Sequence, residues 1–204
     1  MIKPMHTRAF TLVEVLISIA VFVVIMGAVA FFEANVFSYQ RSAAGSFTTV
    51  QDAQVLLKTM ARELRSMSAG NDGSYALFQA ATSSVIFFSD LNGDGSTERV
   101  RYFLSGASLY KGITHASGTP ATYPANAEST STLVTNVRNA SSTPVFEYFD
   151  GSYDGTTPAL VQPVDVGSVR LIKINITLDA DPSRSPAAET YSTQVSLRNL
   201  KDNL

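Results

Sequence analysis

The sequence has no cysteine and no tryptophan among its 204 residues. Without cysteine, the chain can form no disulfide, offers no thiolate ligand to a metal and has no thiol for catalysis. If the domain is exported, it must therefore be held together by its hydrophobic core or by a bound ion. Phenylalanine and tyrosine supply the aromatic bulk of that core.

Charge is also scarce. Charged residues make up 16% of the chain and the net charge is -2, so we predict no nucleic-acid partner. A hydrophobic content of 45% argues against disorder throughout. The only histidines are His6 and His115, and neither lies in a nucleophile motif or at metal-ligand spacing. We therefore expect the protein not to be an enzyme.

Charge is most sparse near the N-terminus, where residues 9–40 contain only Glu14 and Glu33. Residues 15–32 are uncharged, and a helix of that length extends about 27 Å, close to the ~30 Å hydrocarbon core of a bilayer. Lys3 and Arg8 precede this segment, which places residues 1–9 in the cytoplasm. The pattern predicts a single-pass inner-membrane protein whose C-terminal domain lies outside the cytoplasm.

Glu14 lies within the apolar segment. A carboxylate there costs about 2.5–3.5 kcal/mol at the bilayer centre and less near its edge. No basic residue follows before Arg41. The helix itself therefore offers no cation to pair with Glu14.

Residues 8–17, Arg-Ala-Phe-Thr-Leu-Val-Glu-Val-Leu-Ile, resemble the processing motif of type IV prepilins and type II secretion pseudopilins. The resemblance implies that prepilin peptidase cuts between Ala9 and Phe10 and that Phe10 becomes the N-methylated terminus. It also implies that Glu14 pairs with the N-terminal amine of a neighbouring subunit in a filament. Ala9 stands where the family most often has glycine.

Two alternatives for this segment stay open. Residues 28–30, Ala-Val-Ala, could end a secretory signal peptide, although the apolar run is long for one and contains Glu14. A plain signal anchor would not need the Phe-Thr-Leu-Val-Glu string. A signal peptide would make the protein an exported protein such as an enzyme, and a plain anchor would make it a membrane-tethered binding module; neither would polymerise.

Beyond the apolar segment, spacings of three and four predict that one helix continues from near Thr11 to about Met67. Its predicted packing stripe is Phe47, Val50, Gln54, Leu57, Ala61 and Leu64. Residues 62, 63 and 65 are interpreted as a solvated face, and residues 70–73 end the helix.

The periodicity then changes to two, which predicts antiparallel strands with one face on a core. The expected strands lie at 85–88, 100–104, 108–111, 172–178 and 191–197, and polar loops are expected at 114–131 and 150–162. The fold class is therefore α+β, with the helix covering one sheet face.

The order of motifs at residues 90–112 and 136–150 resembles the J-type minor pseudopilins of type II secretion and the W-type minor pilins. The resemblance implies a pilin-like lollipop: a cleaved leader (1–9), a transmembrane assembly helix (10–32), its periplasmic continuation (33–70) and a β head domain (71–204). It also implies four partners, which are other pilin subunits, prepilin peptidase, an inner-membrane assembly platform and membrane lipid.

Asp90, Asn92 and Asp94, followed by Gly95, match the first half of an EF-hand-type calcium loop. The twelfth position is Arg101 instead of the bidentate glutamate, which excludes a complete EF-hand. The alternative is a hairpin turn, because Asn-Gly and Asp-Gly favour one. Calcium is the only cofactor that the sequence suggests, and residues 150–154 form a vaguer second acidic loop.

Overall fold

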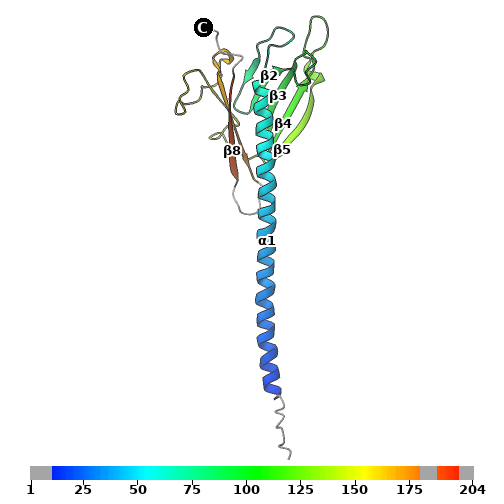
Figure 1. Ribbon diagram of the computed structural model, residues 1–204, viewed down its shortest axis with the longest axis vertical. Helices are drawn as coiled ribbons and strands as arrows, with labels where there is room; N and C mark the ends of the chain where they lie inside the picture. Colours follow the sequence, from blue (N-terminus) through cyan, green and yellow to red (C-terminus); the bar gives the residue numbers. More distant parts are fainter. Residues whose placement is uncertain (1–10, 180–187, 198–204) are drawn as a thin grey trace, which may run out of the picture. The chain divides into compact units, whose positions relative to one another are not determined.

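The structure is a computed structural model that describes residues 11–179 and 188–197, with the side chains of residues 34–49 outside the description. The first element is a long helix, α1 (Leu12–Arg65) (Figure 1). The strands that follow are β1 (Leu77–Ala80), β2 (Ser84–Ser89), β3 (Glu98–Ser105), β4 (Ser108–Thr114), β5 (Ser129–Thr135), β6 (Phe146–Phe149), β7 (Leu171–Leu178) and β8 (Glu189–Ser196). Two 3-10 turns, η1 (Ala125–Ala127) and η2 (Val166–Ser168), lie in the connections. The chain divides into two compact units, residues 1–44 and 45–204.

The first unit consists of the N-terminal part of α1. Its segment Leu12–Glu33 is long and apolar enough to cross a membrane. The side chains of this segment are exposed on every side of the helix. A helix that is apolar all round is stable in lipid or against other apolar helices, because no face of it is suited to water.

The second unit contains two antiparallel sheets. One is a five-stranded meander in the order β1-β2-β3-β4-β5, and the other has the order β6-β7-β8. In the larger sheet Val85 pairs with Tyr102, and Phe87 pairs with Val100. All four are buried on the same face, as the alternation in the sequence predicted.

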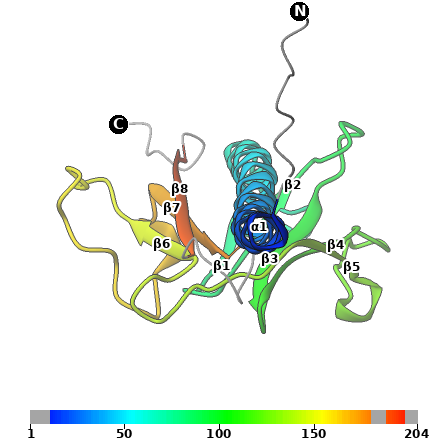
Figure 2. The same ribbon diagram turned by 90° about the horizontal axis from the view of Figure 1, so that it is seen from below.

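The C-terminal part of α1 completes the core of this unit. Ala53, Leu57, Met60 and Leu64 are buried and join one hydrophobic cluster with residues from both sheets. Figure 2 shows this C-terminal part of α1 flanked by the two sheets. The prediction of an α+β fold, with a helix packed on an antiparallel β head domain, is confirmed.

Two details of the predicted helix surface were wrong. Gln54 is exposed, because the buried stripe runs through Ala53, Leu57, Met60 and Leu64 and not through position 54. Glu63, expected on a solvated face, is only 8% exposed. Its carboxylate accepts a hydrogen bond from the hydroxyl of Tyr102 at 2.5 Å and pairs with Lys111 Nζ at 2.7 Å. These partners from β3 and β4 offset the cost of burying the charge.

Candidate functional site

The N-terminus of α1 is organised by Thr11 and Glu14. The Glu14 amide donates to Thr11 Oγ1 at 3.3 Å, while Glu14 Oε2 accepts bonds from both the amide and the hydroxyl of Thr11, each at 2.9 Å. This reciprocal arrangement is a capping box, with Thr11 as the N-cap residue and Glu14 three residues later. It fixes the start of the helix at Leu12.

The capping box accounts for a carboxylate at this end of an apolar helix. The first backbone N–H groups of a helix have no intrahelical acceptor, and the helix dipole favours negative charge there. Glu14 is therefore placed where its charge is tolerated even without a cation. The part played by Thr11 was not predicted, although the Thr-x-x-Glu spacing is a sequence signal for the start of a helix. Ala9 and Phe10 lie outside the described residues, so the predicted cleavage and methylation sites stay predictions.

Ser18 is the next polar residue along the apolar segment. Its hydroxyl donates to the Glu14 carbonyl oxygen at 2.7 Å, one helical turn back. Its polar group is thereby satisfied within the helix, so Ser18 adds little to the cost of placing the segment in lipid.

A comparison with known protein families identifies the kind of N-terminal segment that this chain has. Residues 4–30 match the family model described as the prokaryotic N-terminal methylation motif. The chain thus has a type IV prepilin-like N-terminus. No curated protein and no solved structure matches the chain. The prepilin-like motif indicates processing by prepilin peptidase and interaction with other pilin subunits, and with the apolar helix it is consistent with membrane anchoring.

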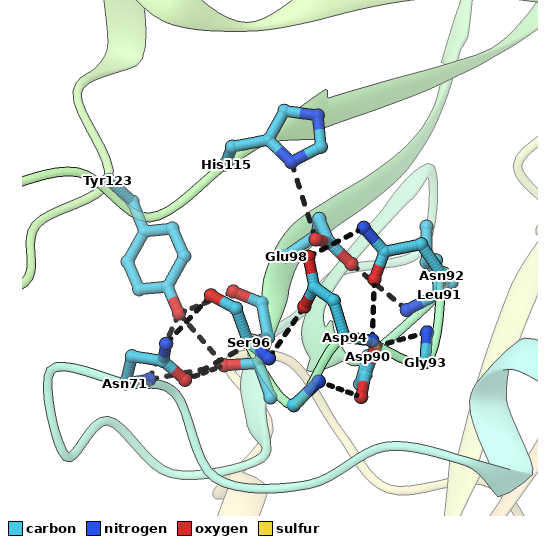
Figure 3. Close-up of polar contacts among 12 residues, drawn as sticks. Asn71, Asp90, Leu91, Asn92, Gly93, Asp94, Ser96, Glu98, His115 and Tyr123 are labelled. Carbon is cyan, nitrogen blue, oxygen red and sulfur yellow. Dashed lines mark hydrogen bonds and ion pairs between the residues drawn. The ribbon is translucent and has the colours of Figure 1, made fainter.

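The second predicted site, at residues 90–95, is the loop of the β2–β3 hairpin (Figure 3). Asp90 Oδ1 accepts a bond from the amide of Gly93 at 2.7 Å, and Asp90 Oδ2 accepts one from the amide of Gly95 at 2.9 Å. Asn92 Nδ2 donates to Asp94 Oδ2 at 2.9 Å. The Ser96 amide, with help from Asn92, holds the pKa of Asp94 below its usual range. The hairpin alternative therefore describes this loop.

These side chains hold the loop in shape by accepting hydrogen bonds from main-chain amides of the same loop. In the part of the chain that the structure describes, no group of three or more histidine, cysteine or acidic side chains is placed to hold a metal ion. Calcium at Asp90, Asn92 and Asp94 stays a prediction. If calcium binds, it must use the acceptor sites of Asp90 that the main-chain amides leave free.

Behind the loop lies a buried carboxylate that the sequence analysis did not single out. Glu98, the first residue of β3, is 2% exposed. Its Oε2 accepts the amide of Leu91 at 2.9 Å, and its Oε1 lies 3.3 Å from Nδ1 of the exposed His115 (Figure 3). No sequence pattern could link these two residues, because only the pairing of β3 with β4 brings them together. Glu98 therefore ties the hairpin loop to the end of β4.

A second set of contacts joins the turn after α1 to this region. The Tyr123 hydroxyl donates to the Thr97 carbonyl oxygen at 2.8 Å and accepts the Asn71 amide at 3.0 Å (Figure 3). Asn71 Oδ1 accepts the Thr97 amide at 3.1 Å. Three segments distant in sequence are thereby fastened together at one end of the head domain. The network is structural in character, since each polar group in it is engaged by another part of the chain.

Residues 150–154 form an acidic loop after β6. Asp154 Oδ1 accepts bonds from the amides and hydroxyls of Thr156 and Thr157, at 2.8 to 2.9 Å. These bonds, led by the Thr156 amide, lower the pKa of Asp154. Ser152 similarly lowers the pKa of Asp150. Both carboxylates are therefore charged at neutral pH.

Proposed function

We propose that the protein is a structural minor subunit of a type IV pilus-like or type II secretion pseudopilus filament. One observation carries the proposal: the methylation motif at residues 4–30 overlaps a helix whose apolar side chains are all exposed from Leu12 to Glu33. Such a helix needs lipid before assembly and neighbouring apolar helices after it. In this proposal the protein is not an enzyme and binds no nucleic acid.

The geometry of Glu14 supports a way for the helix to enter a filament. Both bonds from Thr11 go to Oε2 of Glu14. Within the described residues no hydrogen bond is donated to Oε1, which can accept a bond from the amine of a neighbour's Phe10. The capping box can thus persist while the carboxylate gains its cation, since a carboxylate has acceptor sites on both oxygens. A charge-assisted bond in an apolar surrounding would fix the register between two helices.

Before assembly, the chain is proposed to be a membrane-bound precursor. The precursor lies in the inner membrane with its leader in the cytoplasm and its head domain outside. Prepilin peptidase removes residues 1–9, and an inner-membrane assembly platform lifts the helix out of the lipid. Within the filament, the chain is proposed to be a minor subunit that resembles either the J-type minor pseudopilins or the W-type minor pilins.

The mature N-terminus, measured by mass spectrometry, is the first test. We expect a chain that begins with N-methyl-Phe10. A chain that begins at Phe31 would show cleavage after Ala30 by a signal peptidase and would overturn the proposal. An uncut, membrane-bound chain that never polymerises would favour the tethered binding module.

The second test compares two substitutions in the capping box. Glu14→Ala removes the carboxylate, and we expect normal processing with impaired assembly. Thr11→Val is the matched control, because it removes the capping hydroxyl but keeps the carboxylate, and we expect it to assemble better than Glu14→Ala. Filament yield and the mature N-terminus are measured for both. Normal filament yield from Glu14→Ala would contradict the role proposed for Glu14.

A further inference from the structure

The loop of the β2–β3 hairpin contains the only Asn-Gly pair in the sequence, Asn92-Gly93. An asparagine side chain can be attacked at Cγ by the main-chain nitrogen of the next residue, which closes a five-membered succinimide ring and releases ammonia. Glycine in the next position favours this attack, because no side chain stands beside the nitrogen. Both residues are exposed, so water also has access to the pair.

The sequence pair by itself does not indicate reactivity, because Asn-Gly is also a preferred dipeptide in hairpin turns. Gly93 has a φ of 76°, a conformation that glycine adopts readily and other residues rarely do. A turn therefore accounts for the presence of glycine at position 93. What the turn does not require is the set of polar contacts around the side chain of Asn92.

These contacts match the three needs of an attack on Cγ of Asn92 (Figure 3). The attacking Gly93 nitrogen donates its N–H to Asp90 Oδ1 at 2.7 Å, so a carboxylate already holds the proton that must be removed. Asn92 Oδ1 accepts the Asp94 amide at 3.1 Å, which stabilises the negative charge that develops on this oxygen. The leaving nitrogen, Nδ2, donates to Asp94 Oδ2 at 2.9 Å.

We propose that Asn92 is a site of self-catalysed deamidation in the folded protein, with Asp90 as the general base. The Gly93 nitrogen passes its proton to Asp90 and forms a bond to Cγ of Asn92. The bond from Cγ to Nδ2 breaks, and Nδ2 leaves as ammonia after taking up the proton that Gly93 lost. One water molecule then opens the succinimide at either carbonyl, which leaves aspartate or isoaspartate at position 92.

The reaction would change the electrostatics of the loop. Nδ2 of Asn92, a hydrogen-bond donor, is replaced by an oxygen that faces Asp94 Oδ2. One hydrogen bond is lost, and a contact between like charges takes its place. Because the released ammonia does not return, the modified fraction increases with time after folding. The reaction needs only the folded loop and water, so it is independent of the filament role.

Asn139 provides a contrast within the same chain. Its Oδ1 accepts the Thr177 amide at 2.9 Å, and its Nδ2 donates to the carbonyl oxygens of Thr143 and Asn175, each at 2.9 Å. The next residue is Ala140, and among the described residues no carboxylate accepts a bond from its amide. Asn139 thus has a polarised carbonyl without the glycine or the base, and we expect it to keep its amide.

The direct test compares the folded loop with the same segment unfolded. Full-length protein in detergent and a synthetic peptide of residues 88–97 are incubated at neutral pH in water enriched in heavy oxygen. Mass spectrometry of proteolytic fragments follows the conversion of Asn92, with Asn139 as the internal control. We expect one heavy oxygen at position 92 and a rate several-fold higher in the folded protein than in the peptide. A rate in the folded protein equal to or below that of the peptide would overturn the proposal.

Two substitutions identify the base. Asp90→Asn keeps an oxygen that can accept the Gly93 amide but removes the carboxylate, so deamidation in the folded protein should slow several-fold. If the substitution also loosens the loop, the rate should still fall to that of the peptide. Asp165→Asn is the matched control, because Asp165 Oδ1 accepts the Gly167 amide at 3.0 Å in a different loop, and it should leave the rate at Asn92 unchanged. An unchanged rate in Asp90→Asn would overturn the proposal.

Discussion

Lys111 Nζ lies 2.7 Å from the carboxylate of Glu63, and both side chains are nearly buried. The Tyr102 hydroxyl donates to the same carboxylate at 2.5 Å. The three residues come from α1, β3 and β4, so one buried polar cluster joins the helix to the larger sheet. A buried ion pair adds little net stability, but removing one partner is costly because the other is left charged in an apolar site.

The first prediction concerns this pair. Glu63→Ala should lower the free energy of unfolding of the head domain by about 3–5 kcal/mol, because it leaves the Lys111 ammonium without a partner. Chemical denaturation of the full chain in detergent, followed by near-ultraviolet circular dichroism of tyrosine, measures the loss. Lys58→Ala, at an exposed position of the same helix, is the control and should cost less than about 0.5 kcal/mol.

A further variant separates burial of charge from loss of packing. Glu63→Leu combined with Lys111→Met removes both charges and keeps apolar volume, so it should recover most of the stability lost in Glu63→Ala. If Glu63→Ala costs no more than the control, the pair does not behave as a buried ion pair.

The second prediction concerns Gly112, which lies beneath the Glu128 side chain on the outer face of β4. A Cβ at position 112 would collide with Oε1 of Glu128. The Glu128 carboxylate pairs with Arg101, whose Nη2 is 2.5 Å away. Gly112→Ala should therefore displace the flexible end of Glu128 and break that pair, at a cost of up to about 1 kcal/mol, because Arg101 is partly exposed.

A double-mutant cycle checks the cause. In the background of Glu128→Ala, the collision is absent, and the Gly112→Ala substitution should cost much less. Equal costs in both backgrounds would show that Gly112 is required for a reason other than Glu128. Urea denaturation of the full chain measures all four free energies.

The third prediction concerns alkaline pH. Burial, reinforced by the nearby Glu63 carboxylate, raises the pKa of Tyr102 above its ordinary value of 10.0, and burial likewise raises the pKa of Tyr148. Since the pKa is higher in the folded state, the stabilisation is complete below pH 10 and is lost as the pH rises above it. We expect these two tyrosines to ionise only when the head domain unfolds.

Tyrosinate absorbance and circular dichroism, recorded over the same alkaline titration, test this expectation. Two phases should appear, an early one from exposed tyrosines and a later one that coincides with loss of structure. Tyr102→Phe removes one buried ionisable hydroxyl and should reduce the second phase. Titration of every tyrosine in one phase near pH 10, with the fold intact, would contradict the prediction.

The fourth prediction concerns calcium. If Asp90, Asn92 and Asp94 bind the ion, calcium should raise the melting temperature of the head domain, because a ligand that binds only the folded state stabilises it. A chelator should reverse the rise, and Asp90→Asn should abolish it. An unchanged melting temperature in calcium and in chelator would remove the ion from this protein.

The sequence predicted those parts of the fold that have a local period. Apolar residues recur every two positions along β3 and β7, and every three or four along α1, so these elements were predicted with nearly the right bounds. The β5 strand was missed, because its exposed serines and threonines carry no alternating apolar pattern and were taken as part of a loop.

The candidate site could be predicted from the sequence only where its residues are contiguous. The motif around Glu14 is contiguous, so it could be read directly from the sequence, as could the hairpin at residues 90–95. The burial of Glu63 could not be predicted, because its two partners lie 39 and 48 residues away. Contacts of that kind depend on how the helix lies against the sheet, and a local pattern contains no information about it.

The buried residues Ala53, Leu57, Met60 and Leu64 have a consequence for the boundaries of any soluble fragment. They belong to the same helix as the apolar segment, yet they fill the space against both sheets. A truncation placed at the visible start of the β-rich region, near residue 71, would remove them and leave two sheets with exposed apolar faces. The head domain is therefore independent of the anchor only if the cut falls before residue 50, so its functional boundary lies inside the helix and not at its end.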